Sequence, residues 1–265
     1  MNDLNKSVQS DGSTRSILIG NNFVVGVKIG VGNFGEVRIG KNLFNEEQVA
    51  IKLESVAAKR HQLQQEEQAY KLLGRTEGIP RMRYYGYCNN YKYNAIVIDL
   101  LGQSLADLLE ICGGTFSLKT TAMIALQLLD RIQYVHQKEL LFRDVKPENF
   151  LIGLHSEHKS HIIYIIDFGL SRRYVDPKTG NHIPYRENAP LNGTARYMSI
   201  NAHFGRETSR RDDLEALGYM FLYFLRGSLP WQNLKSDKHE SKCVKIGLLK
   251  KSTSLEQLCN GFPGS

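Results

Sequence analysis

The chain has 265 residues, of which 42% are hydrophobic and 23% are charged, with a net charge of +7. This is the composition of a globular protein that is long enough to bury one large or two small cores, so disorder of the whole chain is excluded. No stretch reaches the apolar length that a bilayer requires, and the first residues are too polar for a signal peptide.

The four cysteines, Cys88, Cys112, Cys243 and Cys259, have no paired spacing. Neither a zinc ribbon nor a disulfide framework is therefore indicated, and a reducing compartment is expected. The positive charge is compatible with nucleic acid, acidic lipid or acidic protein as a partner, and its sign alone does not choose among them.

In chain order, residues 1–21 predict a disordered tail. Between Asn22 and Glu54, three runs rich in β-forming residues, FVVGVKIG, GEVRIG and QVAIKLE, are separated by turns and predict a meander of strands. A helix is predicted over 62–73, ending at Gly74, and a buried strand over 95–101.

After Leu101 the pattern becomes helical. A helix is predicted over 118–136, and a shorter buried helix over 214–225, where the apolar run is too short to span a membrane. The chain therefore reads as a small β-rich lobe over 22–101 and a larger helical lobe over 102–265, with a ligand site expected between them. The apolar stripe expected on the long helix is Met123, Leu126, Leu129, Ile132 and Val135.

The string GVGNFGEV at residues 30–37 has the G-x-G-x-x-G-x-V spacing, and glycines allow backbone to approach phosphates closely. The same glycines could open a dinucleotide-binding helix. The residues that follow, EVRIG, are β-formers without a helical stripe, so a glycine flap between two strands is favoured.

Lys52 ends the run VAIK within an apolar strand, where a lysine needs an anionic partner such as a phosphate. A carboxylate on the next helix is expected to hold it. Glu66 is preferred because it shares a stripe with Leu63 and Tyr70, and Glu67 is the competing candidate.

The most specific run is FRDVKPEN at 142–149, followed by DFG at 167–169. Asp144 at the start of a loop could accept the proton of an incoming hydroxyl, and Lys146 could neutralise a moving phosphate. Asn149 and Asp167 offer the hard oxygen ligands that suit Mg²⁺.

Taken in this order, the motifs resemble those of protein kinases, from about Asn22 to the end of the chain. The resemblance implies an α+β, two-lobed fold, with an antiparallel sheet and one helix in the small lobe and a mainly helical large lobe. It implies ATP and Mg²⁺ as cofactors, Asp144 as the catalytic base and, with it, Lys146, Asn149 and Lys52 as catalytic residues. Mg²⁺ would be held by Asn149 and Asp167.

For the nucleotide, the resemblance implies an adenine held between apolar side chains, backbone hydrogen bonds to its edge, and phosphates on the glycine string and on Lys52, which pairs with Glu66. The implied set is Ile29, Gly30, Val31, Gly32, Asn33, Phe34, Gly35, Glu36, Val37, Ala50, Lys52, Glu66, Asp99 and Leu101.

The subfamily shows in the string GTARYMSIN at 193–201, because SIN stands where most kinases have Ala-Pro-Glu. This string, with HIPYRE, SRRDDLEALG and RGSLPW, is similar to the casein kinase 1 family, and GNFGEVRIGKNL leans toward its gamma branch. The resemblance implies serine/threonine protein substrates that are acidic or already phosphorylated, with Arg196 and Lys242 as their anion site. It also implies that Asp213 anchors the catalytic loop and that activity needs no phosphate on the activation segment.

We therefore expect a monomeric protein kinase, cytoplasmic and also compatible with the nucleus, with protein substrates, no nucleic acid and no membrane anchor in this chain. Phe142 stands where kinases usually have His or Tyr, a position of packing. The family's catalytic domain continues beyond the last residues here, which favours a fragment or a short isoform. A non-catalytic protein that binds nucleotide is the alternative that this departure leaves open.

Overall fold

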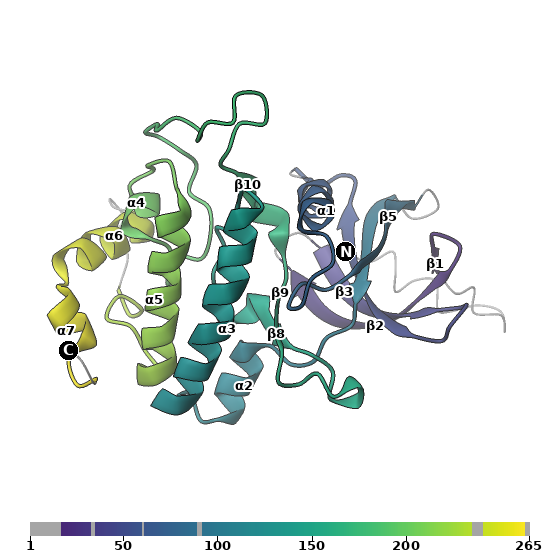
Figure 1. The fold of residues 1–265 in the computed structure, drawn as a ribbon, viewed down its shortest axis with the longest axis horizontal. Helices are drawn as coiled ribbons and strands as arrows, with labels where there is room; N and C mark the ends of the chain where they lie inside the picture. Colours follow the sequence, from purple (N-terminus) through teal and green to yellow (C-terminus); the bar gives the residue numbers. More distant parts are fainter. Residues whose placement is uncertain (1–16, 33–34, 60, 89–91, 235–240, 263–265) are drawn as a thin grey trace. The chain divides into compact units, whose positions relative to one another are not determined.

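The computed structural model describes residues 17–32, 35–59, 61–88, 92–234 and 241–262. The chain divides into two compact units, drawn in Figure 1: Met1–Leu63 with Arg81–Leu100, and Gln64–Pro80 with Leu101–Ser265. The first is mainly β and the second mainly α, which confirms the predicted α+β class. Residues 64–80 group with the second unit, whereas the sequence placed them in the first lobe.

The first unit is built on a six-stranded antiparallel sheet in the order β1-β2-β3-β4-β6-β5. The predicted meander is confirmed, and the strand predicted over 95–101 ends two residues earlier. Two strands were missed. One of them, β1, lies inside the predicted tail, so that prediction was wrong at these two residues, while residues 1–16 lie outside the described part. The strands are β1 (Leu18–Ile19), β2 (Phe23–Gly32), β3 (Gly35–Asn42), β4 (Gln48–Ser55), β5 (Met82–Cys88) and β6 (Tyr93–Asp99).

Alternation along the strands gives this sheet two different faces. Val49, Ile51 and Leu53 of β4 point into a buried apolar core, together with Ala95 and Val97 of β6. Because successive side chains of a strand point to opposite faces, the intervening residues of β4, at positions 50 and 52, lie on the other face. The core therefore fixes which side of the sheet carries the lysine of the VAIK motif.

The joint between β4 and helix α1 (Gln62–Leu73) is made by Glu54, which is 1% exposed. Its Oε1 accepts hydrogen bonds from the backbone N–H groups of Gln62, at 2.7 Å, and Leu63, at 3.2 Å. The first N–H groups of a helix have no partners within it. A carboxylate at that end also interacts favourably with the positive end of the helix dipole. The strand that carries Lys52 thus holds the start of α1.

The second unit contains helices, single 3-10 turns and two small two-stranded sheets, β7 with β10 and β8 with β9. In Figure 1 the two long helices, α3 and α5, run side by side. The elements are α2 (Leu105–Ile111), α3 (Leu118–Gln137), β7 (Leu140–Leu141), β8 (Phe150–Ile152), β9 (Ile163–Ile165), β10 (Arg172–Arg173), α4 (Ile200–His203), α5 (Arg210–Arg226), α6 (Lys242–Ser252) and α7 (Leu255–Cys259), with 3-10 turns at Pro147–Asn149, His155–Glu157 and Phe168–Leu170.

The stripe predicted for α3 was wrong at three of its five positions. Met123, Leu126 and Leu129 are exposed, and only Ile132 and Val135 are buried. A spacing of three residues drifts around a helix of 3.6 residues per turn, so the five side chains cannot share one face. The buried face follows the helical period instead, through Thr121, Ile124, Leu128, Ile132 and Val135.

Leu214, which opens the apolar run predicted as a buried helix, is likewise half exposed. Over the ranges described above, no helix combines the length and the apolar character needed to cross a bilayer.

We expect Glu54→Gln to lower the free energy of unfolding by about 1–2 kcal/mol, because a neutral amide is a weaker acceptor for the two N–H groups at the start of α1. Chemical denaturation measures this. The control is Glu157→Gln, which removes an exposed carboxylate paired with Lys159 at 2.7 Å and should change stability by less than about 0.5 kcal/mol. Equal stability of Glu54→Gln and the parent would contradict the capping role.

Candidate functional site

The glycine string covers the end of β2 and the start of β3. Gly30 pairs with Val37, and Gly32 pairs with Gly35. Asn33 and Phe34, two of the predicted nucleotide-binding residues, lie outside the described residues. At Gly35 a Cβ atom would lie 1.7 Å from the carbonyl oxygen of Leu53. Only glycine fits there, because β3 passes so closely over β4 at this point.

The face of the sheet opposite the apolar core carries three of the predicted nucleotide-contacting side chains, those of Val37, Ala50 and Lys52. Lys52 lies between Val37 on β3 and Ile96 on β6, and Ala50 is two residues before it on the same face. Ile29 is half exposed and falls in the irregular part of the β2–β3 pairing. The carboxylate of Glu36 forms an ion pair with Nε of Arg38, at 2.8 Å. Lys52 thus lies between apolar side chains on this face of the sheet.

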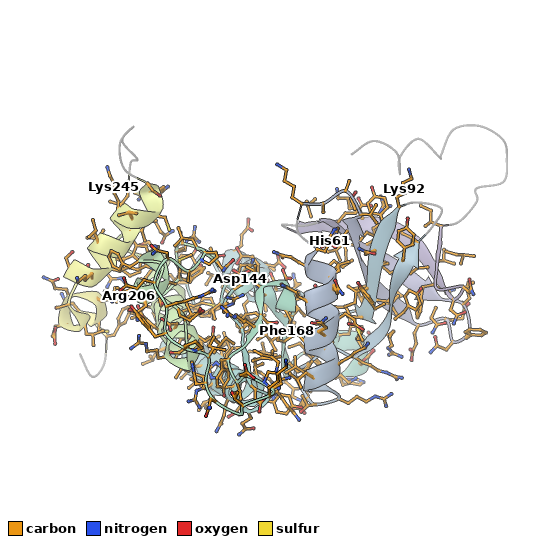
Figure 2. The ribbon with its side chains drawn as sticks, turned by 90° about the horizontal axis from the view of Figure 1, so that it is seen from above. His61, Lys92, Asp144, Phe168, Arg206 and Lys245 are labelled. Carbon is orange, nitrogen blue, oxygen red and sulfur yellow. The ribbon has the colours of Figure 1, made fainter. Side chains whose placement is uncertain are left out.

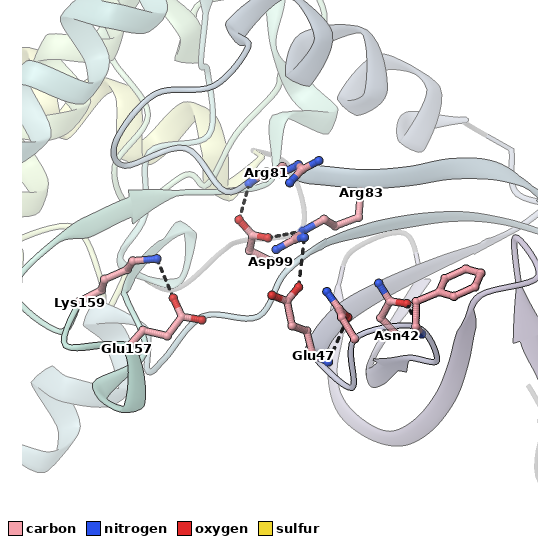
Figure 3. A network of polar contacts seen from close by, with 9 residues as sticks. Asn42, Glu47, Arg81, Arg83, Asp99, Glu157 and Lys159 are labelled. Atoms are coloured by element: carbon pink, nitrogen blue, oxygen red, sulfur yellow. Dashed lines mark hydrogen bonds and ion pairs between the residues drawn. The ribbon is translucent and has the colours of Figure 1, made fainter.

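Asp99 is the last residue of β6, and both oxygens of its carboxylate accept hydrogen bonds, as Figure 3 shows. Its carboxylate accepts hydrogen bonds from the backbone N–H of Arg81, at 2.8 Å, and from Nε of Arg83, at 2.7 Å. Arg83 also pairs with Glu47 at 3.2 Å. The Asp99 amide donates to the carbonyl of Arg81. These contacts fix the backbone at the position for which an adenine contact is predicted.

Leu101, the other backbone position predicted to contact adenine, opens the second unit. Its neighbour Gly102 donates through its amide to the carbonyl of Ile152, at 2.8 Å. A Cβ at Gly102 would come within 3.1 Å of the Gly153 carbonyl. The chain after Leu101 is therefore held against the end of β8.

The loop with the FRDVKPEN motif is held by one buried carboxylate, that of Asp213 on the first turn of α5. Its Oδ1 accepts from the Arg143 amide at 2.8 Å, and its Oδ2 accepts from the Phe142 amide at 2.9 Å. The Nε2 atom of His136 on α3 lies 2.8 Å from the same Oδ2. The prediction that Asp213 anchors this loop is confirmed.

Arg143 adopts a left-handed conformation, with φ of 67°. Such a conformation costs a non-glycine residue of order 1–3 kcal/mol. The contact of its amide with Asp213 and a 2.7 Å hydrogen bond from its Nε to the Leu170 carbonyl offset that cost. Burial, together with the neighbouring charge of Arg172, lowers the pKa of the Arg143 guanidinium to about 10, so the group remains charged at neutral pH.

Asp144, labelled in Figure 2, is 3% exposed, and its carboxylate is surrounded by three side-chain donors. Oδ2 lies 2.5 Å from Nζ of Lys146 and 3.2 Å from Nδ2 of Asn149. Oδ1 accepts from the hydroxyl of Thr194 at 3.1 Å. The structure thus brings three of the predicted catalytic residues, Asp144, Lys146 and Asn149, into one cluster and orients the carboxylate on both sides.

The two predicted magnesium ligands are brought together by the pairing of β8 with β9. Phe150, next to Asn149, pairs with Ile165, and the Ile166 amide donates to the Asn149 carbonyl at 3.0 Å. The Nδ2 atom of Asn149 donates to Asp144, which leaves the amide oxygen to serve as a metal ligand. An amide oxygen and the carboxylate of Asp167 are oxygen ligands of the kind that Mg²⁺ takes. This donor set fits the ion.

Of the two candidate partners for Lys52, Glu66 is 1% exposed on α1, and Glu67 forms an ion pair with Lys71 one turn further on. The pairing of Glu66 with Lys52 stays a prediction. The same helix contacts the DFG motif, because the ring of Tyr70 meets that of Phe168 edge-on, with the centroids 5.3 Å apart.

Phe142 is fully buried and packs edge-on against Phe168, with the centroids 5.5 Å apart, and it also contacts Phe150. Its position is therefore one of packing. Phe168, labelled in Figure 2, joins the DFG turn to the catalytic loop through this contact.

A second buried carboxylate, that of Glu207, bonds to two arginines of the segment after the DFG motif. It accepts hydrogen bonds from Arg172, at 2.9 Å, and from Arg186, at 2.5 Å. These arginines and Arg143 line one hollow of the second unit. Glu207 thus supplies, from within the chain, a negative charge that links residues 172 and 186.

Arg196 and Lys242, the predicted anion site, both lie in the second unit. The guanidinium carbon of Arg196 lies 5.0 Å from the centroid of the Tyr223 ring and 5.7 Å from that of Tyr197. Lys242 is the first residue of α6 and is exposed. Stacking on two rings limits the directions in which Arg196 can point.

Sequence reasoning assigned no role to Thr194 or Glu207. Thr194 directly follows Gly193 in the GTARYMSIN string. This position is the sequence signal that could have identified Thr194 as part of the site. Gly193 has a φ of 97°, and a Cβ there would lie 2.6 Å from the Arg143 carbonyl. Glu207 carries no local signal, because the arginines that it binds are 35 and 21 residues away.

Residues 23–259 match the protein kinase domain family. Over 251 residues the chain is 53% identical to a protein named casein kinase I homolog 1 from Schizosaccharomyces pombe, covering 95% of this chain and 56% of that protein. It is 51% identical to casein kinase I homolog 2 from the same organism, covering 95% and 57%. It is 48% identical over 260 residues to casein kinase I homolog RAG8 from Kluyveromyces lactis, covering 97% and 48%.

The chain spans about half the length of the curated relatives it matches. None of these three names specifies a gamma branch, so the assignment to that branch stays a prediction.

We expect Asp213→Ala to destabilise the second unit by about 3–5 kcal/mol, because two buried backbone amides and His136 would lose their common acceptor. Denaturant unfolding measures the change. Asp130→Ala, which removes an exposed aspartate of α3, is the control and should change stability by less than about 1 kcal/mol. A loss for Asp213→Ala no larger than that of the control would show that the loop is held by other contacts.

Proposed function

We propose that this chain, which belongs to the casein kinase 1 family of protein kinases, transfers the γ-phosphoryl group of ATP to serine and threonine hydroxyl groups of proteins. One observation carries the proposal. The carboxylate of Asp144 is buried and oriented by Lys146, Asn149 and Thr194 on a loop that Asp213 holds.

For the nucleotide, we propose that the sheet face with Val37, Ala50 and Lys52 receives ATP, with Ile29 beside it. The apolar side chains would contact adenine. The Lys52 ammonium would bind the α- and β-phosphates, as this strand lysine does in protein kinases. The close approach of β3 to β4 at Gly35 supports a glycine string whose backbone can come near phosphate.

For the chemical step, Asp144 would accept the proton of the substrate hydroxyl as its oxygen attacks the γ-phosphorus. The bond from that phosphorus to the bridging oxygen breaks, and ADP leaves with the bonding electrons. Lys146, 2.5 Å from Asp144, would stabilise the negative charge of the transferring group. When bound, Mg²⁺ neutralises the phosphates, and Asn149 and Asp167 are the residues that would hold it.

As substrates, we propose proteins with an acidic or already phosphorylated residue near the target hydroxyl. The exposed Lys242 and the ring-stacked Arg196 support this, since an arginine forms charge-assisted, bidentate hydrogen bonds with phosphate. Glu207, by binding Arg172 and Arg186, supports activity without a phosphate on the activation segment. The non-catalytic alternative has no support, because each relative above is named a casein kinase I homolog.

We expect Asp144→Asn to lower the rate of phosphoryl transfer to an acidic or pre-phosphorylated peptide by about 10²–10⁴-fold, because the proton acceptor is lost. The assay is transfer of labelled phosphate from Mg-ATP. The variant should still gain thermal stability from Mg-ATP, because that gain requires only binding to the folded state. Asp130→Asn should keep full activity, and transfer that survives in Asp144→Asn would refute the assignment of the base.

We expect Thr194→Val to lower kcat by about tenfold, because it removes a hydrogen bond to a charged acceptor while keeping the shape of the side chain. Thr194→Ser restores the hydroxyl and is the matched control. Steady-state kinetics with both substrates measures the effect. If the valine and serine variants have equal kcat, the hydroxyl does not orient Asp144.

A further inference from the structure

Lys250 is a buried lysine that the proposed mechanism does not use. It is 3% exposed, near the end of α6 in the second unit. Its Nζ donates to two backbone carbonyls, those of Met198 at 2.5 Å and Ala195 at 3.1 Å. The rings of Tyr219 and Trp231 lie over it, with centroids 4.5 and 4.9 Å away. A charge is thus used inside the protein to hold backbone oxygens.

Two other side chains hold the same stretch of backbone. His203 on α4 has its Nε2 atom 3.2 Å from the Ala195 carbonyl, and Trp231 donates from Nε1 to the Arg196 carbonyl at 2.7 Å. The carbonyls of residues 195, 196 and 198 are therefore each bound by a buried side chain from another part of the second unit. Arg196 lies in the middle of this held stretch.

Helix α6 carries both Lys250 and Lys242, one of the two basic residues of the proposed anion site. Lys242 is its first residue and Lys250 lies two turns later, so a contact at Lys250 also fixes where Lys242 stands. The helix approaches α4 closely at Gly247, where a Cβ would lie 2.6 Å from the Cβ of His203. In Figure 2 the label of Lys245 marks this helix.

We propose that Lys250 is a positioning residue for substrate recognition: by binding the carbonyls of Ala195 and Met198, it fixes Arg196 relative to Lys242, which lies on its own helix. The pair then presents two cationic groups at a set spacing to an acidic or phosphorylated residue of the substrate. Lys250 itself touches no substrate. The inference rests on the proposed function, since it concerns the anion site of the same kinase.

The test compares Lys250→Met with Lys251→Met, an exposed lysine one residue further on. Both remove one positive charge from α6. With a peptide that carries phosphoserine before the target serine, Lys250→Met should raise KM about tenfold, the equivalent of one lost charge-assisted hydrogen bond. Its kcat, its KM for ATP and its KM for the same peptide with alanine in place of phosphoserine should stay within about twofold.

Comparison of the two peptides separates positioning from misfolding. Lys250→Met leaves the carbonyls of Ala195 and Met198 without this donor, so it should lower the free energy of unfolding, and KM is measured under conditions where denaturant unfolding shows the variant to be folded. An equal rise of KM for both peptides would indicate a general structural defect and overturn the inference.

The pH profile of the unmodified chain supplies a readout that needs no variant. Burial lowers the pKa of Lys250 to about 7, so its charge is lost as the pH rises through that value. KM for the phosphopeptide should then rise between about pH 6.5 and 8.5. The charge of the peptide does not cause this rise, because phosphoserine is doubly charged at the upper end of the range. In Lys250→Met this rise should be absent.

The titratable groups that face Lys250 are Glu215 and Tyr219 on α5, His203 on α4 and Cys243 on α6. Burial lowers the pKa of His203 to about 4 and raises the pKa of Tyr219 and of Cys243. These three therefore titrate outside the range of the measurement. An equal rise in Lys250→Met would overturn the inference.

Arg196→Ala and Lys242→Ala distinguish failure of the inference from failure of the proposed function. If neither raises KM for the phosphopeptide above that for the alanine peptide, the anion site itself is wrong. If both raise it and Lys250→Met does not, the anion site stands and only the positioning role of Lys250 fails. Agreement of all three, with Lys251→Met unchanged, supports both.

Discussion

The buried carboxylate of Asp213 is the contact on which the candidate catalytic site depends. By accepting the amides of Phe142 and Arg143, it holds the backbone in a left-handed turn at Arg143 that brings Asp144 to its donors. The same turn leaves room only for a glycine at position 193, where a Cβ would strike the Arg143 carbonyl. Thr194, next to that glycine, then reaches Asp144. One aspartate on α5 therefore determines how two separate segments meet at the proposed base.

The joints of this protein share a physical device, which is a buried charge bound to backbone groups of another segment. Glu54 binds the first amides of α1, Asp213 binds the amides of the catalytic loop, and Lys250 binds the carbonyls of Ala195 and Met198. Burying a charge is costly unless its hydrogen bonds are satisfied. The backbone groups at each joint also need hydrogen-bond partners. The buried charge supplies those partners, and the backbone groups in turn satisfy the charge. Such contacts fix position more than they add stability, which suits a site whose chemistry depends on geometry.

The sequence alone predicted the fold class, strands β2, β3, β4 and β6, the bounds of α1 and the role of Asp213, because these rest on local periodicity and on an ordered set of motifs. It missed β5, whose MRYYGYC run has no clean alternation and whose pairing shifts register between Met82 and Tyr84. It chose the wrong face of α3 because the apolar residues recur every three positions in the sequence, whereas a helix has 3.6 residues per turn, so they drift around its surface. Lys250 and Glu207 could not be found at all, since their partners are distant in the sequence.

The most direct measurement of the central claim is the single-turnover rate of phosphoryl transfer by Asp213→Asn, set beside its affinity for Mg-ATP. The amide keeps the size of the side chain but faces the loop's N–H groups with one acceptor in place of two. Our account predicts that the rate of the chemical step falls while the affinity for the nucleotide is retained. An unchanged rate in a folded Asp213→Asn protein would contradict it, because Asp144 would then be positioned without the carboxylate.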